Sequence, residues 1–427
     1  MNIESLYQKF TECSIVSTDT RKLPKDCIYF ALKGDNFDGN KFASKALEAG
    51  AKYCVVDNKD AVINSNCILV DDVLSTLQAL ATFHRKSIGI PIISLTGSNG
   101  KTTTKELIHS VLSSTYNVKA TKGNLNNHIG VPLTLLSFTK DLEFGIVEMG
   151  ANHQKEIEFL CNIAQPDYGL ITNFGKAHLE GFGSIEGVIK GKSELYDYLK
   201  RHKKTIFINS DDQKQLNQIG DYPKVSTFGR NNNNDCKVEF INANPFVSLK
   251  YEGIKINSKL IGDYNYGNIA VAVAIGQQFK VTAENIKNAI ENYQPNNNRS
   301  EIIQKGTIEI ILDAYNANPT SMLAALKNLK QLNSVNKYLF LGDMFELGPE
   351  AEMEHQEIVN FIASNFDKNV YLIGKNFYKT NTNSSILKFS TFEDLKPELK
   401  NLELENATLL IKGSRGMALE RILDFIQ

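Results

Sequence analysis

Residues 91–106 read PIISLTGSNGKTTTKE. The apolar, β-branched run from Ile92 to Leu95 predicts a strand that is buried on both faces. Gly97-Ser98-Asn99-Gly100 predicts a turn, and the residues from Lys101 onward favour a helix. A strand, a glycine turn, GKT and a helix are the context of a phosphate-binding loop, because the N–H groups of the turn and the helix N-terminus attract an anion.

The glycine spacing departs from the common phosphate-loop pattern, G-x-x-x-x-G-K-[ST]. Leu95 stands where the first glycine of that pattern would be, so the loop is the shorter GSNGKT. The simplest alternative is a glycine turn that carries a lysine by chance. The flanking strand and helix favour an ATP site instead, in which Lys101 contacts the phosphates and Thr102 holds Mg²⁺.

The composition is that of a globular protein without a strong charge. The 427 residues predict about three domains, at roughly 150 residues each. A net charge of −1 gives no electrostatic reason to bind nucleic acid or an anionic membrane. The six cysteines include no CxxC pair, so we expect reduced, packed thiols. The N-terminal residues lack a signal-peptide pattern and no apolar run has membrane-spanning length, so we expect a cytoplasmic protein without a membrane anchor.

The apolar runs predict an α/β protein of three domains. Residues 1–88 predict a small α/β unit, residues 89–295 a central parallel-sheet domain with the phosphate loop, and residues 296–427 a doubly wound C-terminal domain. The run Asn296-Asn297-Asn298 is the predicted linker before the third domain. The principal predicted strands are 27–32, 53–56, 92–95, 144–150, 168–171, 206–209, 308–312, 338–341, 370–373 and 408–411, and predicted helices include 41–49, 185–199 and 269–275.

Polar residues that follow predicted central strands are candidate ligand contacts, because open α/β sheets bind ligands beyond the carboxyl ends of their strands. Glu148 is a candidate Mg²⁺ ligand at such an end, although it could be a solvated strand terminus. His178 follows the strand at 168–171, although a lone histidine is usually structural. Lys192 lies in a predicted helix, where residue type alone favours a solvated surface charge.

Other polar stretches have both structural and functional interpretations. Residues 17–21 (STDTR) and 33–39 (KGDNFDG) predict surface turns on composition alone. The loop at 122–132, KGNLNNHIGVP, is unusually rich in amide side chains. Asn265 and Asn268 stand where a helix opens and could cap it.

Nine strings, in order along nearly the whole chain, resemble those of the Mur ligases, the ATP-dependent amide-bond-forming enzymes of peptidoglycan precursor synthesis. They are STDTR and LKGDNFDGN in the first domain; TGSNGKTTTKE, KGNLNNHIGVPLTLL, VEMGAN and NFGKAHLEGFGS in the second; and DAYNANPTSM, LGDMFELG and KGSRGMALE in the third. One such string would be weak evidence, whereas nine in the same order are specific.

The resemblance implies a UDP-sugar domain, an ATPase-like central domain and a Rossmann-like ligase domain. It also implies a reaction: ATP, with Mg²⁺, phosphorylates the terminal carboxylate of UDP-MurNAc-tripeptide, and the amine of D-alanyl-D-alanine then attacks the acyl phosphate. The products would be UDP-MurNAc-pentapeptide, ADP and phosphate. We expect a monomer that binds these two small substrates.

The resemblance further implies roles for individual residues. Lys101, His178 and Lys192 are the expected catalytic residues, with Lys192 carried as a carbamate. The expected nucleotide contacts are Gly97, Ser98, Asn99, Gly100, Lys101, Thr102, Thr103, Asn268, Arg299 and Asp313. The expected Mg²⁺ ligands are Thr102, Glu148, His178 and the Lys192 carbamate. The expected substrate contacts are Ser17, Thr18, Lys33, Gly34, Asn126, Asn127, Asn316, Lys412, Ser414 and Arg415.

Two residues of the first domain depart from the family pattern: Thr20 replaces a common serine, and Asn40 a common histidine. Three alternatives stay open. The sibling ligase that adds the third peptide residue typically carries a DNPR-type loop, which this sequence lacks. Folylpolyglutamate synthase shares the short phosphate loop but has no UDP-sugar domain. A nucleotide-binding scaffold without catalysis is disfavoured by the intact Lys101, Glu148, His178 and Lys192.

Overall fold

The phosphate-loop stretch forms the strand and the helix that its sequence predicts. In the computed structural model, strand β7 (Ile92–Thr96) is buried along its whole length. Its side chains alternate between two hydrophobic cores, with Ile92 in one and Ile93 and Leu95 in the other. Helix α4 (Lys101–Ser113) follows the glycine turn. The strand therefore lies inside a sheet that is covered by helices on both faces.

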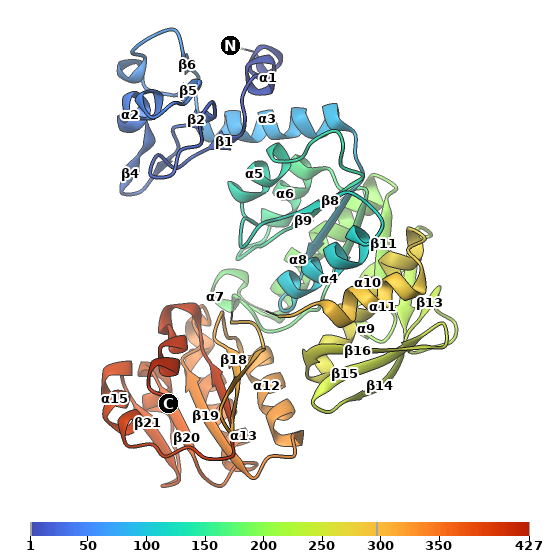
Figure 1. The fold of residues 1–427 in the computed structure, drawn as a ribbon, viewed down its shortest axis with the longest axis vertical. Coiled ribbons are helices and arrows are strands. Elements are labelled where there is room, and N and C mark those ends of the chain that lie inside the picture. Colours follow the sequence, from blue (N-terminus) through green and yellow to red (C-terminus); the bar gives the residue numbers. More distant parts are fainter. Residues whose placement is uncertain (1, 296–297, 427) are drawn as a thin grey trace.

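The structure describes residues 2–295 and 298–426, which fold as three α/β units (Figure 1). The first unit lies at one end of the long axis, the central unit in the middle and the C-terminal unit at the other end (Figure 1). The predicted linker at 296–298 falls largely outside the described residues, because 296 and 297 are not among them. The domain boundary there stays a prediction.

The first unit contains a parallel four-stranded sheet of order β1-β2-β5-β6. Its strands are β1 (Val16–Ser17), β2 (Ile28–Phe30), β5 (Tyr53–Val56) and β6 (Cys67–Leu69), with a hairpin of β3 (Lys33–Gly34) and β4 (Phe37–Asp38). Its helices are α1 (Ile3–Thr11), η1 (Gly39–Phe42), α2 (Ala43–Glu48), η2 (Lys59–Ala61) and α3 (Val73–Ile88). Helix α3 packs against α1 and also against central helices α5 (Gly130–Leu136) and α6 (Glu156–Ala164), so it joins the two units (Figure 1).

The central unit is built on a parallel seven-stranded sheet of order β13-β12-β11-β10-β7-β9-β8. Its other strands are β8 (Val118–Ala120), β9 (Phe144–Glu148), β10 (Tyr168–Ile171), β11 (Thr205–Asn209), β12 (Val225–Gly229) and β13 (Cys236–Lys237). A three-stranded antiparallel sheet follows, made of β14 (Glu239–Ala243), β15 (Phe246–Tyr251) and β16 (Ile254–Ile261). The remaining helices are α7 (Leu179–Phe182), α8 (Ile185–Arg201), α9 (Gln213–Ile219), η3 (Asp263–Asn265), α10 (Tyr266–Gln278) and α11 (Ala283–Asn292).

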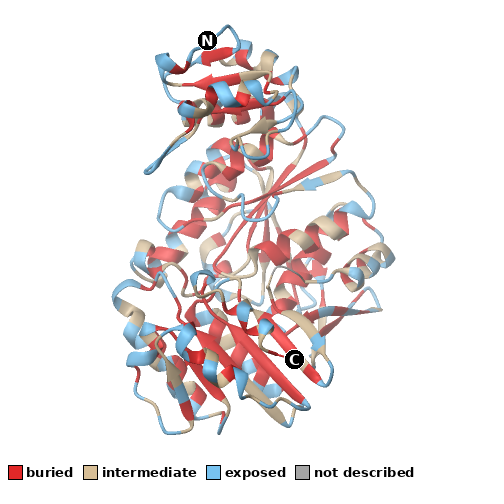
Figure 2. Ribbon diagram, turned by 60° about the vertical axis from the view of Figure 1, so that its left-hand side comes forward, coloured by how far each residue is buried: buried red, intermediate tan, exposed pale blue. Residues whose placement is uncertain are grey.

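The C-terminal unit has a six-stranded sheet of order β17-β18-β22-β19-β20-β21, in which only the edge strand β17 is antiparallel. Its strands are β17 (Glu301–Lys305), β18 (Ile308–Asp313), β19 (Asn336–Gly342), β20 (Val370–Ile373), β21 (Ile386–Phe389) and β22 (Ala407–Lys412). Its helices are α12 (Pro319–Gln331), η4 (Gly348–Glu350), α13 (Ala351–Ala363), α14 (Lys375–Lys379), α15 (Phe392–Lys400), η5 (Arg415–Met417) and η6 (Leu419–Asp424). The four strands predicted here all form, and most of their residues are buried (Figure 2).

All six cysteines are free thiols, as the sequence predicts; five are buried and Cys13 is half-buried. Burial raises the pKa of Cys13 to about 11 and that of Cys54 to about 12, which suppresses the reactive thiolate at neutral pH. Across residues 2–295 and 298–426, no helix has the length and apolar character needed to cross a membrane.

Candidate active site

A cleft of about 1550 Å³ lies between the central and the C-terminal units, and Leu74, Ser75 and Gln78 of α3 in the first unit also line it. Its central wall comes from loops at the carboxyl ends of β7, β9, β10 and β11, and its other wall from residues that follow β18, β19 and β22. Parallel strands present their polar ends at one edge of a sheet, so both sheets direct such ends into the same space. This arrangement favours a ligand shared by two domains.

The phosphate loop forms the floor of the cleft. Gly97 has a φ of +147°, and a Cβ there would lie 1.9 Å from Thr172 Oγ1, so only glycine fits. No side chain caps the start of α4, which leaves its first N–H groups free for an anion. Lys101 Nζ donates to Gly97 O at 2.8 Å. Burial lowers the pKa of Lys101, and a bound phosphate would favour its charged form.

Glu148, the last residue of β9, is only 1% exposed, so the alternative interpretation as a solvated strand terminus is wrong. Its Oε1 accepts from Asn126 Nδ2 at 2.8 Å and lies 3.4 Å from Thr102 Oγ1. Its Oε2 is buried with no hydrogen-bond partner among the described residues, and Lys105 Nζ is 4.0 Å away. A buried carboxylate oxygen that lacks a hydrogen bond and lies beside a threonine hydroxyl fits a Mg²⁺ ligand set.

His178 directly precedes α7 and has the left-handed backbone conformation, with a φ of +53°. Its Nδ1 lies 2.5 Å from Oε2 of Glu346, a residue of the C-terminal unit that the sequence analysis did not single out. The imidazole lowers the pKa of Glu346. Within the described part of the chain, no three His, Cys, Asp or Glu side chains form a metal cluster. A Mg²⁺ site would therefore also need hydroxyl and substrate oxygens.

Lys192 is completely buried in α8, so the expectation of a surface charge, made from residue type alone, is wrong. Its Nζ donates to Ala151 O at 2.9 Å and lies 5.0 Å from the centre of the Phe182 ring. Neither group neutralises an ammonium. Burial therefore holds the pKa of Lys192 well below its ordinary value and favours the uncharged amine.

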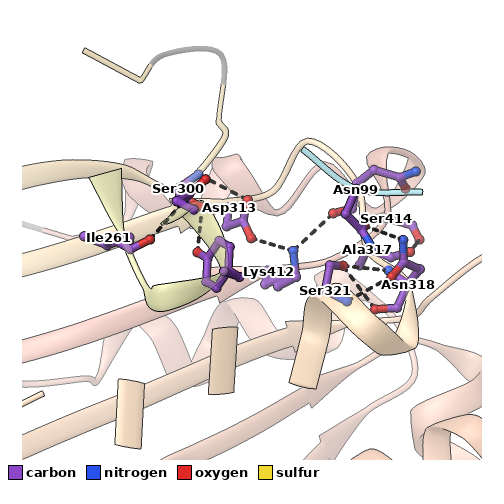
Figure 3. Close-up of polar contacts among 12 residues, drawn as sticks. Asn99, Ile261, Ser300, Asp313, Ala317, Asn318, Ser321, Lys412 and Ser414 are labelled. Atoms are coloured by element: carbon purple, nitrogen blue, oxygen red, sulfur yellow. Dashed lines mark hydrogen bonds and ion pairs between the residues drawn. The ribbon is translucent and has the colours of Figure 1, made fainter. Parts of the chain in front are cut away.

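The opposite wall is cationic. The Arg299 guanidinium lies 3.6 Å from the centre of the Tyr315 ring, and the Arg415 guanidinium lies 5.7 Å from the same ring. Lys412 Nζ donates to Asp313 Oδ2 at 2.5 Å and to Asn316 O at 3.3 Å (Figure 3). Positive charge on this wall faces the phosphate loop, as a reaction between two anions requires.

Several expected contact residues already use their polar atoms within the protein. Asn127 Oδ1 accepts from two backbone N–H groups at the start of α5. Ser414 Oγ accepts from Phe345 N at 2.8 Å. Asn268 lies below the phosphate loop, where its Oδ1 accepts from Thr104 Oγ1 at 3.1 Å. The interpretation of Asn265 and Asn268 as helix caps is wrong, because no side chain caps α10.

The structure gathers most of the expected site residues around one cleft. Those that line it are Ser98, Asn99, Gly100, Lys101, Thr102, Thr103, Asn126, Asn127, Glu148, His178, Asn268, Arg299, Asp313, Asn316, Lys412, Ser414 and Arg415. Gly97 and Lys192 lie beneath it. Ser17, Thr18, Lys33 and Gly34 belong to the first unit and are separate from this lining.

Other lining residues were missed by the sequence analysis. Asp211 and Asp212 follow β11, and Glu346 follows β19, so the strand-end rule applied to every strand would have found them. Arg230, whose guanidinium packs against the rings of both Phe240 and Tyr266, carried no comparable signal.

Three family models match the chain in succession. They are the Mur ligase family, catalytic domain, at residues 12–92; the Mur ligase middle domain, at 95–276; and the Mur ligase, glutamate ligase domain, at 298–415. The UDP-N-acetylmuramoyl-tripeptide--D-alanyl-D-alanine ligase of Bacillus subtilis is 35% identical, over 96% of this chain and 93% of the relative. The chain belongs to the Mur ligase family. The Escherichia coli enzyme of the same name is 34% identical over the same shares of the two chains.

Solved structures agree with the assignment of this chain to the Mur ligase family. A crystal structure of MurF from Acinetobacter baumannii superposes with a TM-score of 0.86, at 29% identity, and covers 99% of this chain and 98% of the other. MurF ligase from Thermotoga maritima, solved in complex with ADP, gives a TM-score of 0.84 at 25% identity and covers 96% of each chain. The predicted family and three-domain α/β fold are confirmed.

Proposed function

We propose that this Mur ligase joins D-alanyl-D-alanine to the terminal carboxylate of UDP-MurNAc-tripeptide, with ATP as the energy source and UDP-MurNAc-pentapeptide, ADP and phosphate as products. One observation carries the proposal: a phosphate loop beside a buried Glu148 oxygen that has no hydrogen bond among the described residues faces a cationic wall across one cleft. The names of the curated relatives, which match nearly the whole chain, support the choice of acceptor. The ATP requirement favours a cytoplasmic location.

The sibling reactions have weaker support. The structure of a UDP-N-acetylmuramoyl-L-alanyl-D-glutamate--2,6-diaminopimelate ligase shares 17% identity and a TM-score of 0.54, which is likeness of fold alone. A folylpolyglutamate synthase from L. casei shares 15% identity and a TM-score of 0.57. Neither likeness bears on the substrate.

The first chemical step moves a phosphoryl group between two anions. A carboxylate oxygen of the tripeptide attacks the γ-phosphorus of ATP; the new O–P bond forms as the bond to the β–γ bridging oxygen breaks, and ADP leaves. Lys101 and the N-terminus of α4 would neutralise charge on the nucleotide side, and Arg299 on the other wall. The protein's contribution is to position and neutralise the reactants, not to bond to them.

The second step forms the amide. The free amine of D-alanyl-D-alanine attacks the acyl carbon, a tetrahedral intermediate forms, and its C–O bond to the phosphate breaks. The amine loses a proton as the amide forms. Lys412 and Arg415, on the wall opposite the loop, have the charge to hold the dipeptide carboxylate or the leaving phosphate. We also propose that Asn126, Asn127, Asn316 and Ser414 contribute substrate contacts.

We propose that Thr102 and Glu148 hold one Mg²⁺, and that His178 and Lys192 contribute to a second. The Glu148 oxygen without a hydrogen bond among the described residues, beside the Thr102 hydroxyl, supports the first assignment. Bound there, Mg²⁺ would neutralise charge that develops on the phosphate oxygens. Asn126, which donates to Glu148, would keep the carboxylate turned toward this position.

An ammonium cannot ligate a cation, so Lys192 needs a modification for that role. We propose that its uncharged amine attacks CO₂: an N–C bond forms, one C–O π bond breaks, and the nitrogen loses a proton to leave an anionic carbamate. The buried amine with a lowered pKa supports this reaction, because only the free amine is nucleophilic. Carbamate oxygens are of the hard type that Mg²⁺ prefers.

The remaining assignments concern ATP and the UDP-sugar part of the tripeptide substrate. Asn268, beneath the phosphate loop, is proposed to contact adenine, and Asp313 the ribose. Ser17, Thr18, Lys33 and Gly34 are proposed to hold the UDP-sugar. Lys33 and Gly34 are exposed on the β3–β4 hairpin, while Lys33 pairs with Asp57 at 2.8 Å.

The test is phosphate release from ATP and Mg²⁺ in the presence of UDP-MurNAc-tripeptide, with and without D-alanyl-D-alanine. We expect strong release only when both substrates are present, and a pentapeptide product by mass spectrometry. Release that instead requires a free diamino acid and the UDP-linked dipeptide would assign the sibling step. Absence of release with every one of these substrates would refute the proposed reaction.

A further inference from the structure

The segment that follows β10, residues 172–178, is bonded closely to the phosphate loop. Asn173 O accepts from Ser98 N, and Asn173 Oδ1 accepts from Asn99 N, both at 3.1 Å. Ser98 Oγ donates to Gly175 O at 2.8 Å. A displacement of this joining segment would therefore displace the loop that binds the nucleotide phosphates.

The same joining segment is bonded to the C-terminal unit. Lys176 N donates to Thr320 Oγ1 in the first turn of α12 at 2.9 Å. Lys176 Nζ donates to Oε1 of Glu354, on α13, at 2.5 Å, and Oε2 of Glu357 is 3.8 Å away. A second link runs directly from the loop, because Asn318 Nδ2 donates to Asn99 Oδ1 at 2.7 Å (Figure 3).

The Lys176–Glu354 pair is unlike an ordinary surface ion pair. The Glu354 side chain is 1% exposed, whereas Lys176, at 40%, reaches it from the other unit. A buried carboxylate is costly without a partner, and here the cation comes from across the domain junction. The interaction also raises the pKa of Lys176. Separation of the two units would break this pair, so its free energy depends on the arrangement of the domains.

We propose that Lys176 and Glu354 form an interdomain clasp that positions the joining segment, and with it the phosphate loop and His178, when the C-terminal unit closes over the cleft. Both are positioning residues, because neither lines the cleft among the described residues. The clasp rests on the proposed function only in assays that measure turnover of the Mur substrates. Domain position and nucleotide affinity can be tested without knowledge of the acceptor.

The clasp makes a prediction that separates it from a pair that only stabilises the fold. Loss of the Lys176 charge should weaken the binding of the non-hydrolysable analogue AMP-PNP with Mg²⁺ about tenfold, the scale of typical coupling between two sites. It should also increase the radius of gyration of the AMP-PNP complex. Glu354→Gln should have the same effects, and the double variant should be no worse than either single variant, because both substitutions break one interaction.

The experiment compares full-length wild type with Lys176→Met, Glu354→Gln, the double variant and the charge-conserving Lys176→Arg. Titration calorimetry gives the AMP-PNP affinity, small-angle scattering gives the radius of gyration, and thermal melting reports folding. Lys396→Met is the matched control, because Lys396 pairs with Glu393 at 2.6 Å within exposed α15 and makes no interdomain contact in that pair. Lys176→Arg and Lys396→Met are expected to behave as wild type.

If folded Lys176→Met had the AMP-PNP affinity and the radius of gyration of wild type, the clasp would be overturned. It would also be overturned if the losses of AMP-PNP affinity in Lys176→Met and Glu354→Gln added fully in the double variant. If Lys176→Met fails to fold because it leaves the buried Glu354 carboxylate without its cation, the double variant decides, because it breaks the same pair and leaves no unpaired buried charge. A wild-type protein that binds AMP-PNP but turns over no Mur substrate would refute the proposed reaction and leave the clasp intact.

Discussion

Replacement of Lys192 by alanine removes the amine proposed to carry CO₂. We expect turnover in the phosphate-release assay to fall by on the order of 100-fold or more, as for the loss of a group that supports a metal site. High bicarbonate should not restore it. With ¹³C-labelled bicarbonate, wild type should show a carbamate resonance in the NMR spectrum that Lys192→Ala lacks. Near-normal turnover in the variant would remove the carbamate assignment.

The burial of Lys192 also predicts how stability depends on pH. The pKa of Lys192 is lowered in the folded state, whereas the unfolded chain binds the proton up to its ordinary pKa near ~10.4. Because the unfolded state binds more protons, stability rises with pH toward that value. Between the two pKa values, the free energy of unfolding changes by about 1.4 kcal/mol for each pH unit. Lys192→Met should therefore unfold at higher urea than wild type at pH 7 in CO₂-free buffer, and the difference should shrink by pH 10. A pH-independent difference would contradict this account.

At the scale of the element, the phosphate loop depends on the close approach between Gly97 and Thr172. Gly97→Ala places a Cβ 1.9 Å from Thr172 Oγ1 at a φ of +147°, so the loop must move. We expect AMP-PNP affinity to fall about tenfold or more, which is about 1.4 kcal/mol, with the circular dichroism spectrum unchanged. Gly89→Ala is the control: its φ is also positive, but nothing lies within 4 Å of a Cβ there. Equal AMP-PNP affinities of Gly97→Ala and Gly89→Ala would refute the explanation that a Cβ at position 97 collides with Thr172.

The sequence predicted elements best where burial is continuous. Strand β7 and helix α4 were predicted because an apolar run, a glycine turn and GKT occur together. The strands β17 and β21 were not predicted, because edge strands are half-exposed and their mixed residues make no apolar run. The burial of Lys192 could not be predicted from residue type, since it is decided by packing against Phe182 and Ala151, which lie outside its own helix.

At the scale of the whole molecule, residues of two units share one cleft, so catalysis depends on how the units are arranged. We expect AMP-PNP, Mg²⁺ and UDP-MurNAc-tripeptide together to reduce the radius of gyration of the wild-type protein in small-angle scattering. AMP-PNP without Mg²⁺ is the control and should have a smaller effect. An unchanged radius with all three ligands would count against domain closure.

The sequence also predicted this organisation in outline. Polar residues after the predicted central strands indicated a ligand site there, and the structure brings Glu148 and His178 to one cleft with Lys412 of the C-terminal unit. The relation of the first unit to that cleft was not predicted. Ser17 ends the short strand β1 and Lys33 begins the short strand β3; the position of both relative to the cleft depends on the packing of α3 against α5 and α6, and no local pattern encodes that packing.

The placement of the thiols has a practical consequence. Four cysteines lie in the first unit, two in the central unit and none beyond residue 236, while burial raises the pKa of Cys236 to about 12. A maleimide would therefore find little thiolate on the folded chain, and the third unit contains no cysteine thiol. Val335→Cys, at a position that is 92% exposed, could carry a fluorophore without removal of any native cysteine. The chain is thus already suited to reporting the movement of its third unit in real time.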